Sequence, residues 1–288
     1  MILIVGATGQ LGSMIVHKLL AQNKKVRAFV RRTSDFEMLQ KAGAEIVFGD
    51  LKEPETLLPA FEGVNRVVTT ASATMRGGAD NIDTVDLQGT HDLIDAAIQA
   101  KVEQFVYVSA FGLTSDIPMA LAKAKSQNEA HLKNSGLNYT ILQPVNFMEA
   151  WIGFVIGAQL QKEPTVTIVG DGTVKIGFVA MENVAELAVN VLGHPAAQNS
   201  VIPLNGPRSV SYREIIGLIE SITGQPIKIR SVAPGEPVPG MPPIVNELWA
   251  ILTQKGDLQL DSTEVAKTYN LHLISVEDFI EKMFKSSR

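Results

Sequence analysis

Residues Ile2–Gly12 read ILIVGATGQLG, an apolar run that leads directly into a glycine-rich segment. The run Ile2–Val5 is continuously apolar, as expected of a strand buried on both faces, and an amphipathic helical pattern follows the glycines. Gly6 permits a tight turn, Gly9 lets the backbone approach a pyrophosphate, and Gly12 lets the helix pack close to the strand. The spacing is GxxGxxG rather than the commoner GxGxxG, and a merely tight strand–helix turn is the alternative.

The same alternation of strand and helix patterns continues through the first half of the chain. Short apolar runs lie at Ile2–Val5, Lys25–Val30, Glu45–Phe48, Arg66–Thr70, Gln104–Ser109 and Tyr139–Leu142. Amphipathic stretches lie at Leu11–Gln22, Asp35–Ala42, Pro54–Phe61, Ile82–Ala100 and Ala120–Asn134. Apolar strands that alternate with helices predict an α/β fold with a doubly wound parallel sheet, the Rossmann fold. Ligands of such sheets bind beyond the carboxyl ends of the strands.

The alternation breaks down after Pro144. We therefore expect residues 1–145, completed by about 180–205, to form a dinucleotide-binding domain, and residues 146–179 and 206–288 to form a smaller C-terminal substrate lobe. The expected elements here are helices at Phe147–Leu160, Glu182–Leu192 and Ser275–Lys285 and strands at Thr165–Val169, Lys175–Val179 and Val201–Leu204.

Composition narrows the classes of function. The 288 residues include 25 Lys+Arg and 30 Asp+Glu, a formal net charge of −5, so nucleic acid is not an expected partner. The chain has no cysteine, which excludes disulfides, iron–sulfur clusters and Cys-ligated zinc and favours a cytoplasmic location. The five histidines show no paired-ligand spacing, so no metal site is expected. The apolar runs are too short for a membrane span, and no signal-peptide pattern opens the chain.

The end of the second predicted strand indicates the cofactor. Folds that bind NAD(H) usually place an acid there, where it binds the ribose hydroxyls. In this chain Val26–Val30 runs into Arg31 and Arg32, and the first acid is Asp35. Two guanidinium groups suit a 2′-phosphate, so NADP(H) is expected in preference to NAD(H). A solvated basic turn is the alternative.

The third predicted strand ends at Gly49, Asp50 and Leu51. At the carboxyl edge of the sheet, the Asp50 carboxylate is expected to hydrogen-bond an adenine, and Leu51 is expected to pack on its face. A helix cap before Pro54 is the alternative role for Asp50.

Four segments together carry a family resemblance. They are GATGQLG at Gly6–Gly12, VRAFVRR at Val26–Arg32, GDL at Gly49–Leu51 and KSQNEAHLKNSGLNYTILQPVNFMEAW at Lys125–Trp151. The chain resembles the NmrA-like group of atypical short-chain dehydrogenases/reductases. That group includes NADPH-dependent quinone, triphenylmethane-dye and isoflavone reductases, and also NADP-sensing regulators without catalytic activity.

The resemblance implies which residues hold the cofactor. It implies NADP(H) contacts for Gly6, Thr8, Gly9, Gln10, Leu11, Arg31, Asp50 and Leu51, with Thr70 and Ala71 near the ribose and Pro144, Val145, Asn146 and Phe147 near the nicotinamide. Ser109, which ends the fifth predicted strand, occupies the position of the wider family's catalytic serine. A strand-end hydroxyl that satisfies the backbone is the alternative.

The chain departs from the wider family at the Tyr-x-x-x-Lys motif. The resemblance places the lysine at Lys125, and the tyrosine position is then Leu121, so the usual proton donor is missing. Helical periodicity independently puts Lys125 on the inward stripe, whereas Lys123 lies on the opposite face. We expect Lys125 to bind the nicotinamide ribose and to support catalysis. A lysine that extends to solvent and pairs with Glu129 is the alternative. The stripe consists of Leu121, Lys125, Asn128 and Leu132.

The expected function is NADP(H)-dependent hydride transfer to a small apolar acceptor, a quinone or an aromatic carbonyl. Met75, Met148 and Trp151 are candidates to line the substrate pocket, and a role in the core is their alternative. A quinone is favoured because its reduced oxygen can take a proton from water. The rival function is a redox sensor that binds NADP(H) without turnover and acts through a regulatory protein partner. An epimerase or assembly factor on the same fold is a broader alternative, and a homodimer stays open.

Overall fold

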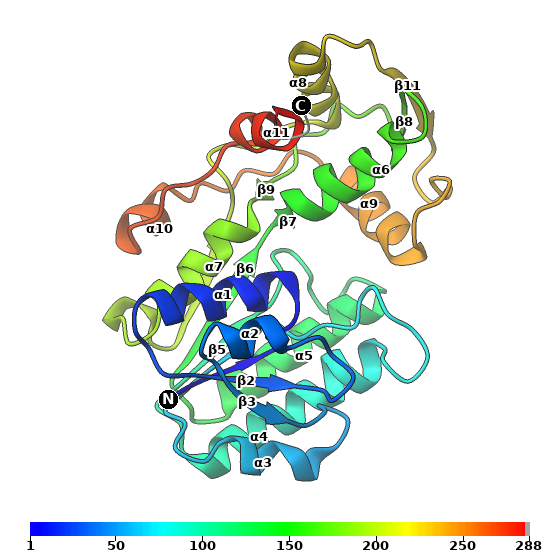
Figure 1. Ribbon diagram of the computed structural model, residues 1–288. Coiled ribbons are helices and arrows are strands. Elements are labelled where there is room, and N and C mark those ends of the chain that lie inside the picture. Colours follow the sequence, from blue (N-terminus) through cyan, green and yellow to red (C-terminus); the bar gives the residue numbers. More distant parts are fainter. Residues whose placement is uncertain (286–288) are drawn as a thin grey trace. The chain divides into compact units, whose positions relative to one another are not determined.

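The computed structural model describes residues 1–285 (Figure 1). The chain divides into two compact units, and each unit draws on several stretches of sequence. Unit 1 comprises Met1–Gln143, Val184–Pro203 and Thr268–Leu271. Unit 2 comprises Pro144–Asn183, Leu204–Lys267 and the chain from His272 onward. The sequence did not predict that Thr268–Leu271 belongs to unit 1, because residues 206–288 were all expected in the C-terminal lobe.

Unit 1 is built on a seven-stranded sheet in the order β10-β6-β5-β4-β1-β2-β3. The strands are β1 (Ile2–Val5), β2 (Val26–Val30), β3 (Glu45–Phe48), β4 (Arg66–Thr69), β5 (Gln104–Val108), β6 (Tyr139–Pro144) and β10 (Ser200–Leu204). β1 pairs in parallel with both β2 and β4, so that Val5 lies opposite Phe29 and Thr69. The predicted doubly wound sheet is confirmed, and its strand order reverses between β1 and β4, where such sheets bind ligands.

Helices cover both faces of this sheet. α3 (Leu57–Ala60), α4 (Thr90–Ala100) and α5 (Ala120–Asn134) cover one face, and α1 (Gln10–Ala21) and α2 (Glu37–Lys41) cover the other (Figure 1). The core between the sheet and α3–α5 includes Leu3, Leu57, Leu93, Phe105 and Leu132. The predicted helical stretch Ile82–Ala100 begins as a π-helix, η2 (Ile82–Gly89), which Asn81 and Thr84 cap reciprocally. The remaining short helices are η1 (Pro54–Thr56), α7 (Met181–Asn190) and η4 (Pro195–Ala197).

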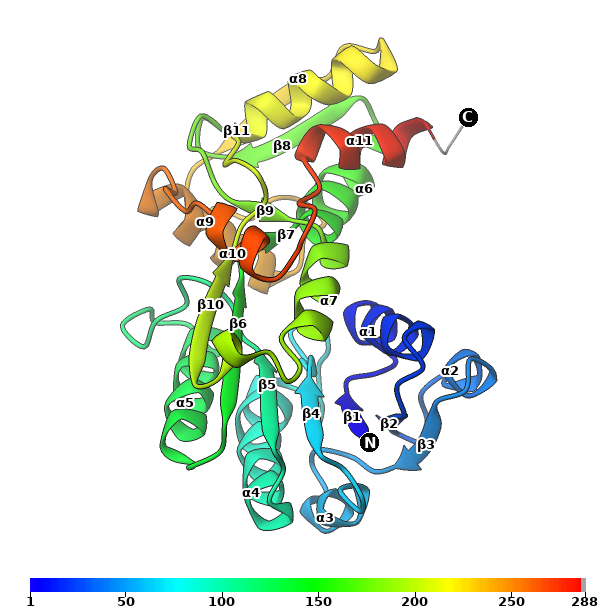
Figure 2. The same cartoon turned by 90° about the vertical axis from the view of Figure 1, so that its left-hand side faces the viewer.

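Unit 2 contains two short parallel strand pairs. β7 (Asn146–Phe147) pairs with β9 (Phe178–Val179), and β8 (Thr165–Val169) pairs with β11 (Lys228–Val232). Figure 2 shows β8 and β11 side by side beneath α8. The helices are η3 (Glu149–Ile156), α6 (Gly157–Leu160), α8 (Tyr212–Thr223), α9 (Pro243–Lys255), α10 (Thr263–Thr268) and α11 (Val276–Lys285).

Several aromatic side chains pack together in the largely aliphatic core of unit 2. The Trp249 ring is fully buried, with its centre 4.6 Å from that of Tyr212 and 5.7 Å from that of Trp151. α8 is fixed at its start by a capping box between Ser211 and Glu214. Within residues 1–285, no helix is both long enough and apolar enough to span a bilayer.

Candidate functional site

The glycine segment forms a close-packed connection between β1 and α1. Gly6 has φ +81°, a left-handed conformation that favours glycine, and a Cβ there would lie 2.8 Å from the Ala71 nitrogen. A Cβ on Gly12 would lie 2.2 Å from the Gly6 carbonyl oxygen, so this glycine sets how closely α1 approaches the turn. Gly9 precedes α1 in an ordinary extended conformation and provides no side-chain cap. The first-turn N–H groups can therefore bind an anion.

An open pocket of about 130 Å³ lies beside this connection, at the carboxyl ends of β1 to β4. It occupies the switch point that the strand order defines. Eight of the predicted cofactor residues line it, namely Gly6, Thr8, Gly9, Arg31, Asp50, Leu51, Thr70 and Ala71. Its other lining residues are Val5, Phe29, Val30, Ser34, Ser72, Arg76, Asp80 and Val85.

The residues that sequence reasoning missed lie mainly in the segment after β4. Ser72, Arg76 and Asp80 come from the connection between β4 and η2, and Val85 lies in η2 itself. Loops after the strands at a switch point border the ligand in this fold class. The position of these residues after β4, a strand at the switch point, is the signal that could have predicted them. No local motif distinguishes their side chains.

Asp80 gathers three basic side chains at this pocket. Its Oδ2 accepts hydrogen bonds from Arg31 Nη1 and, at 3.2 Å, from Arg76 Nη1. Its Oδ1 accepts a hydrogen bond of 2.5 Å from Lys52 Nζ. The bond from Lys52, together with those from Arg31 and Arg76, lowers the pKa of Asp80 to about 2, although burial acts in the opposite direction. The bond to Asp80 likewise raises the pKa of Lys52, so Asp80 and Lys52 are both ionised at neutral pH.

Asp50 and Leu51 follow β3 and border the same pocket. Asp50 Oδ1 accepts a hydrogen bond of 3.0 Å from the Lys52 backbone nitrogen, and its Oδ2 lies 3.7 Å from Lys52 Nζ. The short helix η1 begins at Pro54 and has Glu53 at its cap position, so Asp50 does not cap it. Leu51 is buried and is one of the apolar residues that line the pocket. Contact of these two residues with an adenine stays a prediction.

Among the eight predicted cofactor residues that do not line this pocket are Gln10, Leu11 and Arg32. Gln10 is exposed at the start of α1, whereas Leu11 is buried. The Arg32 guanidinium lies 4.7 Å from the centre of the Phe48 ring in a cation–π arrangement. Of the two adjacent arginines, Arg31 is therefore the one that faces the pocket.

Lys125 is buried in α5, on the face that the helical stripe predicts, whereas Lys123 is exposed. The Lys125 ammonium donates a hydrogen bond of 3.2 Å to the Val108 carbonyl at the end of β5. It also lies 5.0 Å from the centre of the Tyr107 ring. The buried members of the stripe are Leu121, Lys125, Asn128 and Leu132.

A buried polar network surrounds Lys125. The Asn128 amide donates hydrogen bonds to the Tyr107 hydroxyl oxygen at 2.9 Å and to the Asp86 carbonyl oxygen at 2.6 Å. Burial acts to lower the pKa of Lys125, but Tyr107, Asp86 and Glu129 together raise it above its ordinary value. Asp86 Oδ1 and Asn128 Oδ1 are buried without a hydrogen-bond partner among residues 1–285. Acceptors of this kind are usually satisfied by a water or a ligand.

Ser109 uses its hydroxyl within the protein. Its Oγ donates a hydrogen bond of 2.6 Å to Glu129 Oε1. The same carboxylate accepts hydrogen bonds from the Gln143 amide at 2.8 Å and from Lys133 at 3.2 Å. Ser109 therefore satisfies a buried carboxylate rather than the backbone, and Glu129 pairs with Lys133 rather than with Lys125.

The residues predicted near the nicotinamide belong to unit 2. The Val145 nitrogen donates a hydrogen bond of 3.0 Å to the Leu204 carbonyl, and the Asn146 amide donates one of 2.9 Å to the Gly177 carbonyl. Unit 2 contains all four of these residues, which are Pro144, Val145, Asn146 and Phe147.

The predicted substrate residues have different environments. Met148 and Trp151 are buried in the core of unit 2, whereas Met75 is 59% exposed in unit 1, in the loop after β4. Whether any of them contacts a substrate stays a prediction.

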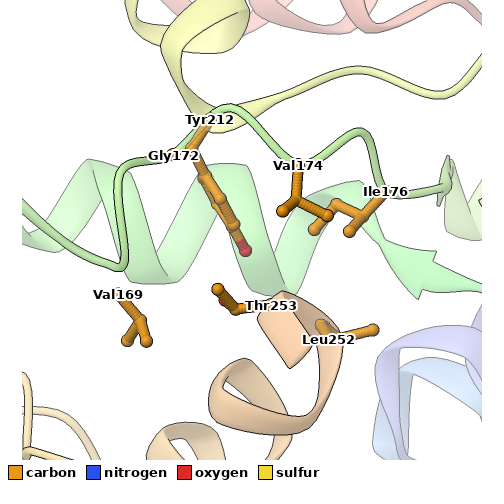
Figure 3. Close-up of a pocket in the computed structure, with 7 residues that line it drawn as sticks. All are labelled: Val169, Gly172, Val174, Ile176, Tyr212, Leu252 and Thr253. Carbon is orange, nitrogen blue, oxygen red and sulfur yellow. The ribbon is translucent and has the colours of Figure 1, made fainter. Parts of the chain in front are cut away.

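Unit 2 also encloses a cavity of about 10 Å³, enough for one water molecule (Figure 3). The Tyr212 hydroxyl points into it toward Thr253 in Figure 3. Tyr212 Oη and Trp249 Nε1 are buried without a hydrogen-bond partner in the described part of the chain, and burial raises the pKa of Tyr212 well above its ordinary value. A space of this size does not hold an organic substrate. Its lining residues are Val169, Gly172, Val174, Ile176, Tyr212, Leu252 and Thr253.

Comparison with known proteins relates the pocket to a cofactor class. The sequence pattern of the family described as NAD(P)H-binding matches residues 6–195. That span includes the glycine segment and every residue that lines the unit 1 pocket except Val5. The matched span covers more than half of the chain.

Individual relatives differ in their described roles. A photosystem II assembly factor, Ycf39 of Cyanophora paradoxa, is 35% identical over 231 residues, which is 80% of this chain and 71% of the relative. An NAD(P)H azoreductase of Xenophilus azovorans is 29% identical over 228 residues, covering 79% and 76%. The NADPH-dependent quinone oxidoreductase QOR2 of Escherichia coli, solved with NADPH, has a TM-score of 0.82 at 21% identity over 99% of this chain and 100% of the other. This last likeness concerns the fold alone.

Proposed function

The chain belongs to the NAD(P)H-binding family, and from that premise we propose that it is an NADP(H)-dependent reductase of a small apolar acceptor, a quinone or an aromatic carbonyl. The observation that carries the proposal is the pocket at the switch point of the sheet, which the glycine connection and Arg31 both line. A cytoplasmic location is part of the same proposal and rests on the lack of cysteine.

The pocket fits an NADP(H) cofactor in two respects. The uncapped start of α1 offers N–H groups to a pyrophosphate, and Gly9 adds no side chain that would obstruct it. Arg31 follows β2 directly, where folds of this kind discriminate between a ribose hydroxyl and a 2′-phosphate. Arg31 therefore supports NADP(H) over NAD(H).

The chemistry that the nicotinamide supplies when bound is hydride transfer. In this proposal Lys125 binds the nicotinamide ribose, and Ser109 and Pro144–Phe147 position that half of the cofactor. Met75, Met148 and Trp151 are the proposed contacts of the acceptor. The protein contributes to catalysis by excluding water and by orienting the nicotinamide and the acceptor.

The missing tyrosine favours a particular kind of acceptor. Leu121 is apolar and cannot donate a proton to a developing alkoxide. A quinone avoids this need, because its reduced oxygens can be protonated by water. An aromatic carbonyl is the less favoured acceptor for the same reason.

A second function is supported by a separate observation. The Ycf39 relative, at 35% identity, is described as a photosystem II assembly factor. With Leu121 in place of the proton donor, the chain is also suited to bind NADP(H) without turnover and to act through a protein partner. A homodimer is compatible with either function.

Oxidation of NADPH in the presence of a panel of quinones separates the two functions. The reductase proposal predicts saturable, quinone-dependent oxidation that Gly9→Val abolishes. Binding of NADPH with no quinone-dependent oxidation across the panel would contradict the reductase and support the partner-dependent function. Absence of NADPH binding altogether would contradict both.

A further inference from the structure

The Asp80 carboxylate sits where an anionic ligand of Arg31 is expected. Asp80 and Arg31 both line the unit 1 pocket and are joined by a hydrogen bond. Lys52 and Arg76 complete the set of donors around the same carboxylate, at 2.5 and 3.2 Å. Convergence of several cationic donors on one oxyanion is also the way proteins bind phosphate groups.

The charges around this carboxylate are not balanced. Three cations, Arg31, Lys52 and Arg76, face two carboxylates, Asp80 and Asp50, which leaves one net positive charge. Without Asp80 the same cations would face Asp50 alone. Asp80 therefore neutralises part of a site that would otherwise attract an anion more strongly.

Asp80 belongs to the loop between β4 and η2, and its ion pairs help to hold that loop. At the start of the loop, the Ala73 nitrogen donates a hydrogen bond of 2.8 Å to Asp86 Oδ2. At its end, Asn81 and Thr84 cap η2. Between these anchors the stretch 74–79 is largely exposed, and Asp80 connects it to Arg31 and Lys52.

We propose that Asp80 is an internal substitute for the cofactor's 2′-phosphate and thereby sets cofactor specificity. In the free protein it occupies the donors of Arg31, Lys52 and Arg76, and it gives them up when a 2′-phosphate binds. The two anions compete, because they share the donors and repel each other. A ligand without the 2′-phosphate leaves the Asp80 contacts intact. This inference rests on the proposed NADP(H) preference of the pocket.

Two nucleotides that differ only in the 2′-phosphate test the inference, namely adenosine 2′,5′-bisphosphate and 5′-AMP. Calorimetric titration of the full chain is expected to show that Asp80→Asn binds the bisphosphate about tenfold more tightly than the wild type, the equivalent of one recovered charge-assisted hydrogen bond. Affinity for 5′-AMP is expected to stay within about twofold. The matched control is Asp83→Asn, which removes the same charge from an exposed position three residues away.

Weaker or unchanged binding of the bisphosphate by Asp80→Asn would overturn the inference, as would equal shifts for both nucleotides. Hydrogen exchange of residues 72–80 in the wild type provides a second test that needs no variant. The bisphosphate is expected to speed exchange of this loop, and 5′-AMP is not; equal exchange with both would also overturn the inference. The proposed cofactor preference fails separately, if the wild type binds the two nucleotides equally and Arg31→Ala changes neither affinity.

Discussion

The Lys125 ammonium donates a hydrogen bond of 3.2 Å to the Val108 carbonyl oxygen, from a buried position in α5. Val108 ends β5 and precedes Ser109, so this bond ties α5 to the carboxyl edge of the sheet. A buried carbonyl that loses its donor costs about 1–3 kcal/mol. Lys125 therefore has a structural contact in addition to its proposed contact with the cofactor.

Replacement of Lys125 by alanine is expected to reduce NADPH-dependent turnover and to lower the free energy of unfolding by about 1–3 kcal/mol. Lys123→Ala is the matched control, because Lys123 is exposed on the same helix, and its effect on unfolding should stay within about 0.5 kcal/mol. Chemical denaturation and steady-state kinetics are measured on both variants. A purely structural role for Lys125 would lower stability and leave both kcat and the KM for NADPH unchanged. Identical behaviour of the two variants would contradict the prediction that Lys125, and not Lys123, faces inward.

The glycine connection allows the fold and the cofactor site to be tested separately. Gly9 has φ −73° and ψ 161°, which any residue adopts, so Gly9→Val is expected to keep the fold and to abolish NADPH binding. Gly12→Val is expected to destabilise the chain, because its Cβ would lie 2.2 Å from the Gly6 carbonyl oxygen. Circular dichroism and NADPH titration distinguish the two outcomes. Retained NADPH affinity in a folded Gly9→Val variant would show that the glycine connection is not part of the cofactor site.

The low pKa of Asp80 predicts an acid-dependent loss of stability. Its pKa in the folded protein is about 2, below the ordinary value of 3.8. The ion pairs of Asp80 therefore stabilise the fold fully above about pH 4, and this contribution is lost as the pH falls from about 4 to about 2. We expect the difference in thermal unfolding midpoint between wild type and Asp80→Asn to shrink over that range. Asp83→Asn serves as the charge-matched control. A constant difference across this range would show that Asp80 has no lowered pKa.

Sequence patterns predicted unit 1 well because its signals are local. Each strand is a short apolar run, and the glycines after β1 have conformational and steric requirements that the structure reproduces at Gly6 and Gly12. Burial of Lys125 followed from helical periodicity alone.

Unit 2 was predicted less completely because its pairings are distant in sequence. β8 pairs with β11 rather than with a neighbouring segment, and β11 is largely exposed, so it lacks an apolar run. The expected strand Lys175–Val179 is reduced to β9 at Phe178–Val179. The expected helix Phe147–Leu160 is a π-helix that continues as α6, a change of pitch that apolar periodicity does not encode.

The candidate site was predicted where a glycine or strand-end signal marks it, as at Gly6 and Arg31. Asp80 was missed because an acid in a loop carries no pattern of its own. Its partner Arg31 precedes it by 49 positions, and only the folded chain brings the two together.

Calorimetric titration with NADPH and NADH tests most directly whether the pocket recognises a 2′-phosphate through Arg31. Wild type is expected to bind NADPH more tightly than NADH. Arg31→Ala should lose about ten- to a hundredfold in NADPH affinity and almost nothing for NADH, the equivalent of one charge-assisted hydrogen bond. Arg32→Ala, whose guanidinium lies over Phe48 instead of facing the pocket, should change neither affinity. Equal affinity of the wild type for both cofactors, or equal losses for both in Arg31→Ala, would contradict recognition of the 2′-phosphate by Arg31.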